Sequence, residues 1–215
     1  GLSLVGIWMQ RIACGWLVWN WTHSAFWLGI LSAGDLLPVL LIGPFAGVAA
    51  DRWDRLRQNK LAQIALASLA LMMAVLLATG HLGLVGLVAL TTAQGTLTAV
   101  IQPARLAMVH QMVRREALGT AVALNSVNIN LARLLGPAAA GAMILHMDIA
   151  WVFVVNAVAS FAFVLVLHRL RLEPFERRHR ALSFLGAMTE GFGHILRSQP
   201  LWLVLLVMLC GGSMV

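Results

Sequence analysis

Residues 27–60 read WLGILSAGDLLPVLLIGPFAGVAADRWDRLRQNK. Up to Ala50 this stretch contains one charged side chain, Asp35, whereas the ten residues that follow contain six. A helix rises about 1.5 Å per residue, so about 20 apolar residues cross the roughly 30 Å of hydrocarbon in a bilayer. The stretch therefore predicts a membrane-spanning helix that ends in a short, highly charged loop.

The composition of the whole chain agrees with this interpretation. Of its 215 residues, 60% are hydrophobic and 11% are charged, against about 45–50% and 25% in soluble domains. Five further apolar runs bring the predicted spans to six, at residues 2–21, 27–50, 61–79, 82–102, 117–145 and 149–167. We therefore expect an all-α polytopic membrane protein with a six-helix bundle over residues 1–168.

Two segments follow the sixth span. Residues 169–200 are expected to form a linker, in which apolar residues recur every three or four positions from Leu182 to Ile195. This spacing predicts an amphipathic helix at the membrane surface, an interpretation compatible with a simple connection between two halves. Residues 201–215 are apolar but cover only about 22 Å. We therefore expect them to begin a seventh span of a longer polypeptide, whose C-terminal half is missing.

The basic residues lie on one side of the predicted spans. Thirteen of the 15 fall in three connections, and the opposite connections, at residues 22–26, 80–81 and 146–148, contain no Lys or Arg. The positive-inside rule therefore predicts that the loops at 51–60 and 105–118 and the linker at 169–200 are cytoplasmic. The net charge of +7 thus indicates contact with the surface of the lipid bilayer, with no nucleic-acid partner expected.

The loop after the second span carries a recognisable pattern, GPFAGVAADRWDRLR at residues 43–57. Glycines four residues apart permit close helix approach, and an acidic side chain at a helix end can contact a neighbouring helix N-terminus or the arginines. The loop resembles the signature loop of the major facilitator superfamily, although Asp54 stands where that family usually has Gly. We call residues 43–57 the gating loop, with the candidate residues Gly43, Gly47, Asp51, Arg52, Arg55 and Arg57.

A second resemblance lies in the fifth span. Gly136, Pro137 and Gly141 are similar to the Gly-Pro element that exporters of this superfamily carry there, with Ala132 and Ala140 in place of two glycines of the full motif. Proline removes a backbone donor and bends a helix, and small neighbours allow the bent helix to pack closely. With Gln-Pro-Ala-Arg at 102–105 and Arg-Arg-Glu at 114–116, the chain resembles the bacterial branch of enterobactin exporters and macrolide efflux proteins.

The resemblance implies the N-terminal half of a twelve-helix secondary transporter in the bacterial inner membrane. It implies proton-driven export of an amphipathic drug, macrolide or siderophore by alternating access between two six-helix halves. Solute uptake by the same fold is one alternative, and a non-transporting sensor or assembly factor is another, which the intact gating loop disfavours. Many proton-coupled members carry an Arg three residues before the pair Gln94 and Gly95, and this chain has Thr91 there.

Charges inside the predicted spans mark a candidate site, because such charges are costly in a membrane. Arg11, Asp35 and Arg133 lie at depths that agree to within roughly 6 Å at 1.5 Å per residue, so Asp35 can pair with either arginine. A structural ion pair and a role in substrate binding or proton coupling both remain open. Neighbouring polar residues either assist this site or form ordinary interhelical hydrogen bonds: Gln10, Gln94, Asn125, Asn128 and Asn130.

Enzyme chemistry finds no support in these residues. All seven histidines lie in predicted loops, helix ends or the linker, and no His-Glu-x-x-His pair is present for zinc. The string Gly-Leu-Ser-Leu at residues 1–4, which is similar to intramembrane serine proteases, lacks a buried His partner. Cys14 and Cys210 lie in apolar runs. We therefore expect neither catalysis nor a cofactor nor a metal.

Overall fold

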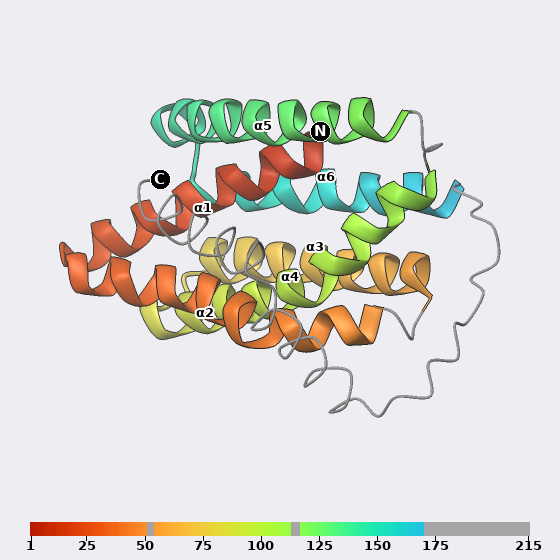
Figure 1. The fold of residues 1–215 in the computed structure, drawn as a ribbon. Coiled ribbons are helices and arrows are strands. Elements are labelled where there is room, and N and C mark those ends of the chain that lie inside the picture. Colours follow the sequence, from red (N-terminus) through yellow and green to blue (C-terminus); the bar gives the residue numbers. More distant parts are fainter. Residues whose placement is uncertain (51–53, 113–116, 170–215) are drawn as a thin grey trace. The chain divides into compact units, whose positions relative to one another are not determined.

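The computed structural model describes residues 1–50, 54–112 and 117–169. The predicted linker, amphipathic helix and seventh span lie outside these residues, as do Asp51 and Arg52 of the gating loop. Every regular element in the described ranges is an α-helix (Figure 1), which confirms the predicted all-α fold. The helices are α1 (Leu2–Thr22), α2 (Ala25–Ala50), α3 (Arg55–Ala78), α4 (Leu84–Met112), α5 (Leu118–His146) and α6 (Ala150–Arg169).

All six helices are long and apolar enough to cross a membrane. Two of them extend beyond the predicted spans by more than two residues, since α3 begins at Arg55 instead of Leu61 and α4 continues to Met112 instead of residue 102. The spans were predicted from apolar residues alone, whereas helical hydrogen bonding continues into polar sequence.

At the start of α3, the Asp54 carboxylate accepts hydrogen bonds from the backbone N–H groups of Leu56 and Arg57, at 2.9 and 3.2 Å. Asp54, the departure from the family pattern, is therefore a helix N-cap.

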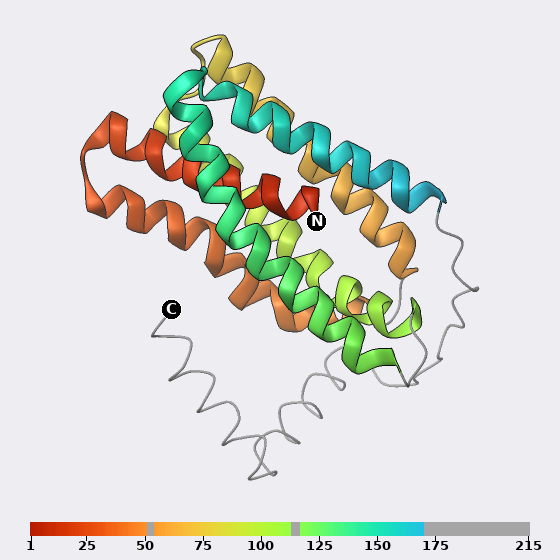
Figure 2. The ribbon, with the colours of Figure 1, turned by 90° about the horizontal axis from the view of Figure 1, so that it is seen from above.

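Helix α1 has the most neighbours in the bundle, since it packs against α2, α4, α5 and α6. Helix α2 packs mainly on α4, and α3 packs on α6 and α4. Figure 2 shows α3 and α6 running side by side, and Figure 1 shows α5 along the side of the bundle where α1 and α6 lie. Helices α1, α3, α4 and α6 therefore surround the interior, and α2 and α5 flank it.

The interior is apolar and closely packed. Phe153, Met73 and Leu87 are completely buried, and they join side chains of α1 such as Val18 in one cluster. By contrast, α2 and α5 expose many large apolar side chains. Exposed apolar surface on membrane-length helices suits contact with lipid or with further helices.

Glycines bring two pairs of helices into backbone contact. A Cβ on Gly95 of α4 would lie 2.5 Å from the carbonyl oxygen of Asp35 on α2, so only glycine allows this approach. On the other side of the bundle, a Cβ on Gly136 of α5 would collide with the Cβ of Trp8 on α1. Gln94 and Thr96, the polar residues on either side of Gly95, are thereby held close to α2.

Candidate functional site

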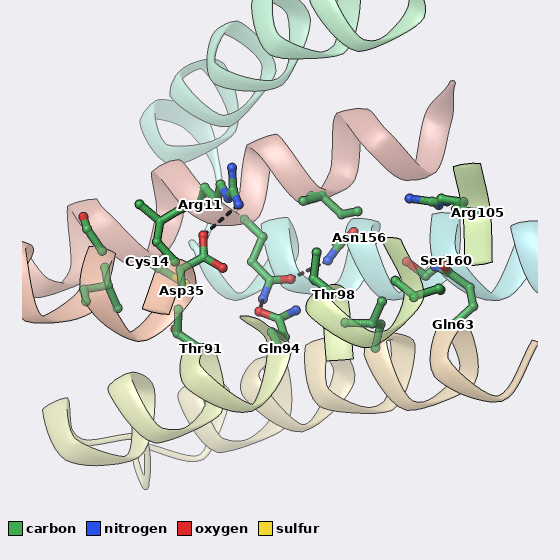
Figure 3. Close-up of a pocket in the computed structure, with 17 residues that line it drawn as sticks. Arg11, Cys14, Asp35, Gln63, Thr91, Gln94, Thr98, Arg105, Asn156 and Ser160 are labelled. Carbon is green, nitrogen blue, oxygen red and sulfur yellow. Dashed lines mark hydrogen bonds and ion pairs between the residues drawn. The ribbon is translucent and has the colours of Figure 1, made fainter. Parts of the chain in front are cut away.

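A cavity of about 280 Å³, lined by both apolar and polar side chains, lies among α1, α2, α3, α4 and α6 (Figure 3). Four of the predicted site residues line it, and all come from the middle of their helices: Gln10, Arg11, Asp35 and Gln94. In Figure 3, Arg11 and Asp35 lie toward one end of the cavity and Arg105 lies at the other. The cavity thus brings charged and amide side chains from five helices together.

Arg11 and Asp35 form an ion pair across α1 and α2. The distance from Nη2 of Arg11 to Oδ2 of Asp35 is 2.8 Å, and the two side chains are 40% and 21% exposed. Asp35 also makes the close backbone contact with α4, because its carbonyl oxygen lies against Gly95. This pair neutralises two charges that would each be costly if they were alone at this depth of a membrane.

An amide network joins three helices beside the ion pair. Gln10 on α1 donates through Nε2 to Oε1 of Gln94 on α4 at 2.8 Å, and also to the sulfur of Met73 on α3 at 3.1 Å. Its Oε1 accepts a hydrogen bond from Nδ2 of Asn156 on α6 (Figure 3). Gln10 thus uses both ends of its amide, which fixes its orientation in the wall of the cavity.

Two amide oxygens of the cavity wall have no hydrogen-bond partner in the described part of the chain. They are Oε1 of Gln63 and Oδ1 of Asn156, and both residues are buried. A buried acceptor without a partner is costly. These oxygens can therefore accept hydrogen bonds from the N–H or O–H groups of a bound molecule or of water.

The four predicted site residues of α5 do not line the cavity: Asn125, Asn128, Asn130 and Arg133. The guanidinium carbon of Arg133 instead lies 5.2 Å from the ring centre of Trp8, and that of Arg11 lies 4.9 Å from the same ring. Depth alone allowed Asp35 to pair with either arginine, and the structure pairs it with Arg11. The reason is that α2 packs against α1 but not appreciably against α5. Asn130 bonds within its own helix, where it donates to the carbonyl of Ser126.

The predicted packing glycines divide into two groups. Gly136 makes a close helix contact, whereas a Cβ on Gly43 or Gly141 would meet no atom within 4 Å. No described atom lies near the Cβ position of Gly43, so its role in close helix approach stays a prediction. Pro137 lies inside α5. In the gating loop, Arg57 is exposed, and the surroundings of Gly47 and Arg55 are outside the described part.

Three polar residues that line the cavity were not predicted from the sequence: Gln63, Asn156 and Ser160. A fourth, Arg105, was predicted to lie in a loop. Each of the first three is a polar residue inside an apolar span, the same signal that singled out Gln10. Arg105 lies beyond the last apolar residues of α4, but the helix continues past it and places its guanidinium 5.6 Å from the Phe163 ring. Burial lowers the pKa of Arg105 from its ordinary value, although a guanidinium stays protonated in proteins.

The described residues contain no group of three His, Cys, Asp or Glu side chains that could hold a metal ion. Six membrane-length helices, five of which line a cavity with an ion pair at mid-helix, are the features of a polytopic membrane transporter. The profile of the family described as transmembrane secretion effector matches residues 2–212. The chain belongs to this family of the major facilitator superfamily, which confirms the resemblance of the gating loop.

Named relatives are similar to the chain over most of its length. The staphyloferrin A transporter of Staphylococcus aureus is 30% identical over 169 residues, covering 77% of this chain and 42% of the relative. The uncharacterized MFS-type transporter YfiS of Bacillus subtilis is 27% identical over 97% of this chain and 50% of its own length. The multidrug efflux pump Tap of Mycobacterium tuberculosis is 27% identical, over 88% and 47%. The chain spans about half the length of the curated relatives it matches.

Proposed function

We propose that the chain is the N-terminal half of a secondary active transporter that exports an amphipathic small molecule from the bacterial cytoplasm. Inward proton flow drives this export, and two six-helix halves alternate in access around the cavity. Family membership supports the transporter class. The names of a siderophore transporter and a multidrug efflux pump among its relatives support an amphipathic substrate.

The observation that carries the proposal is the Arg11–Asp35 ion pair on the wall of the cavity. The carboxylate of Asp35 and the guanidinium of Arg11 neutralise each other while they are paired. A proton or a substrate that separates the pair removes this neutralisation. Asp35 is therefore the proposed coupling group, and it takes this role without the arginine that other members carry at the position of Thr91.

The proposed orientation places the chain in the inner membrane, with the loops at 51–60 and 105–118 and the linker at 169–200 in the cytoplasm. Support comes from the described ends of the helices. Arg57 and Lys60 lie at the start of α3, Arg105 near the end of α4 and Arg169 at the end of α6. Because consecutive spans alternate in direction, these ends lie on one side of the membrane, the side that the positive-inside rule assigns to the cytoplasm.

The gating loop completes the proposed cycle. Asp51 would pair with a helix end or with an arginine in one of the two access states and thereby stabilise that state. The two six-helix halves would separate at this contact of Asp51 when the transporter changes its access state. The substrate, the lipid bilayer, the proton gradient and the C-terminal half of the same protein are thus the proposed partners.

Transport by the full-length protein tests the function and its direction. Everted membrane vesicles are given an acidic interior, and the uptake of dansylglycine, erythromycin and Hoechst 33342 is measured with and without nigericin. Export predicts accumulation that nigericin abolishes. Accumulation only in right-side-out vesicles with an acidic exterior would instead establish solute uptake. Movement of no probe in either orientation, with the protein present in the membrane, would favour the sensor or assembly factor.

A further inference from the structure

The indole ring of Trp8 lies close to arginines of two helices. The guanidinium carbons of Arg11 on α1 and Arg133 on α5 are 4.9 and 5.2 Å from its centre. Both cations interact favourably with the face of the ring, which lowers the cost of holding them near each other. The arrangement therefore concentrates positive charge at the seam between α1 and α5, next to the cavity that Arg11 lines.

Only half of this charge is neutralised by the described residues. Asp35 pairs with Arg11 at 2.8 Å, and it is the one carboxylate inside a described helix. The other described carboxylates, Asp54 and Asp148, accept hydrogen bonds from backbone N–H groups at the starts of α3 and α6. Arg133 therefore has the ring of Trp8 beside it but no counter-ion in the described part of the chain.

The position of Arg133 excludes a lipid-facing role. It lies near the middle of α5 and its side chain is exposed in this half of the protein. An arginine at the centre of a span is costly in hydrocarbon and faces protein or a water-filled path. The phosphates of lipid headgroups lie outside the hydrocarbon, far from this depth. The counter-ion of Arg133 must therefore reach it from within the transporter.

We propose that Arg133, with Trp8 beside it, binds the anionic group of the amphipathic substrate, a carboxylate or sulfonate. A guanidinium offers two parallel N–H donors to such a group, and the indole offers an apolar face to the rest of the molecule. Asp35 keeps Arg11 occupied, so the anion and the coupling carboxylate use different arginines. The inference rests on the proposed transport function and specifies its substrate class.

Binding to the purified full-length protein tests this substrate class without any proton gradient. The probes share one fluorophore and differ in charge: dansylglycine is anionic, dansylamide is neutral and dansylcadaverine is cationic. We expect wild-type protein to bind dansylglycine at least tenfold more tightly than dansylcadaverine. We expect Arg133→Gln to weaken dansylglycine binding about tenfold or more, as loss of a charge-assisted hydrogen bond does, and to change dansylamide binding less than twofold.

Two controls separate charge from structure. Arg133→Lys keeps the charge but loses the paired donors, so its binding of dansylglycine should fall between those of wild type and Arg133→Gln. Arg169→Gln removes an exposed arginine at the end of α6, and it should leave the binding of all three probes unchanged.

Three outcomes would overturn the proposal. Tighter binding of dansylcadaverine than of dansylglycine by wild type would do so without any variant. An equal loss of all three probes in Arg133→Gln would show that Arg133 pairs with a carboxylate elsewhere in the full-length protein. Unchanged dansylglycine binding in that variant would place the anion elsewhere. Because this binding needs no gradient, the binding assay and the transport assay can fail separately. Anion selectivity can hold where proton-driven export fails, and proton-driven export can hold where anion selectivity fails.

Discussion

Nη2 of Arg11 on α1 lies 2.8 Å from Oδ2 of Asp35 on α2, and the pair lies on the wall of a cavity that five helices enclose. The carboxylate is the more buried partner, with 21% of its side chain exposed against 40% for the arginine. A proton that reaches Asp35 through the cavity removes its charge and leaves Arg11 unpaired. In the proposed coupling role, this one protonation event would change the charge balance between two helices.

The first prediction tests this link with Asp35→Asn in the full-length protein. Asparagine keeps the shape of the side chain and loses only the titration. We expect gradient-driven accumulation of substrate to be abolished, whereas downhill exchange and the yield of protein in the membrane stay close to wild type. The measurement compares accumulation in vesicles with and without a pH gradient, together with membrane yield.

A purely structural ion pair gives the opposite result. Removal of Asp35 then leaves the charge of Arg11 without its counter-ion inside a membrane span, which is costly. Asp35→Asn would express poorly, and the double variant Asp35→Asn with Arg11→Gln would recover the yield. Normal uphill transport by the single variant would eliminate the coupling role.

The second prediction concerns the contact that holds α4 against α2. In Gly95→Ala the new Cβ would lie 2.5 Å from the carbonyl oxygen of Asp35 and 3.0 Å from that of Gly34. Both are backbone atoms, so the helices must separate, and overpacking of this kind costs about 1–3 kcal/mol. We expect a lower midpoint of thermal unfolding, measured by tryptophan fluorescence in detergent.

The matched control for this helix contact is Gly29→Ala. A Cβ at Gly29 of α2 meets no atom within 4 Å, and alanine has the higher helix propensity. This variant should unfold at or above the wild-type midpoint. Equal midpoints for Gly95→Ala and Gly29→Ala would show that the approach of α2 and α4 does not limit stability.

The third prediction separates the two acidic residues of the gating loop. Asp51→Asn removes the proposed contact of one access state, and loss of a charge-assisted bond worth about 1.5–3 kcal/mol shifts a two-state balance tenfold or more. We expect most transport to be lost with expression retained. Asp54→Asn should keep transport, because asparagine caps a helix about as well as aspartate.

Asp54→Ala completes the comparison within the gating loop. It removes the side-chain acceptor for the N–H groups of Leu56 and Arg57, and should lower stability by about 0.5–2 kcal/mol. Wild-type export by Asp51→Asn would refute the gating role of that residue. Loss of transport in Asp54→Asn would show that the charge of Asp54 matters beyond its cap.

The fourth prediction tests sidedness with single cysteines in a background that lacks Cys14 and Cys210. Cysteines at His81 and Met147, which are both exposed, should react with an impermeant thiol reagent in intact cells. A cysteine at the exposed Arg57 should react only after the membrane is permeabilised. Labelling of Arg57→Cys in intact cells, with protection of the other two positions, would invert the topology.

The six helices were predictable because a membrane requires about 20 consecutive apolar residues for each span. The ends of the helices were less so. Apolar runs mark where a helix lies in hydrocarbon, whereas α3 is extended at its start by the cap of Asp54 and α4 continues ten residues beyond its predicted end, residue 102, to Met112. These extensions matter for the site, since Arg105 reaches the cavity from the added part of α4.

The candidate site was predictable in part. Rarity of charge in a span singled out Arg11 and Asp35, but depth along a helix could not choose between Arg11 and Arg133 as the partner of Asp35. That choice depends on which helices are neighbours, and α2 packs on α1. Asn156 was missed for the same reason, because its contact with Gln10 joins the first helix to the last described one.

The fifth prediction concerns the hydrogen bond between Gln10 and Asn156. Gln10→Leu leaves the buried Nδ2 of Asn156 without its acceptor and also removes the donor to Gln94. Asn156→Leu leaves Oε1 of Gln10 without its donor. Each buried group that loses its partner costs about 1–3 kcal/mol, although hydrogen bonds between membrane helices average nearer 0.6 kcal/mol in double-mutant cycles.

The double variant removes both groups together, so its destabilisation should be smaller than the sum of the two single values by about 0.5–2 kcal/mol. The measurement is the free energy of unfolding of the full-length protein and the three variants in mixed micelles. Additive values would show that the two amides do not depend on each other and that other contacts hold α1 against α6.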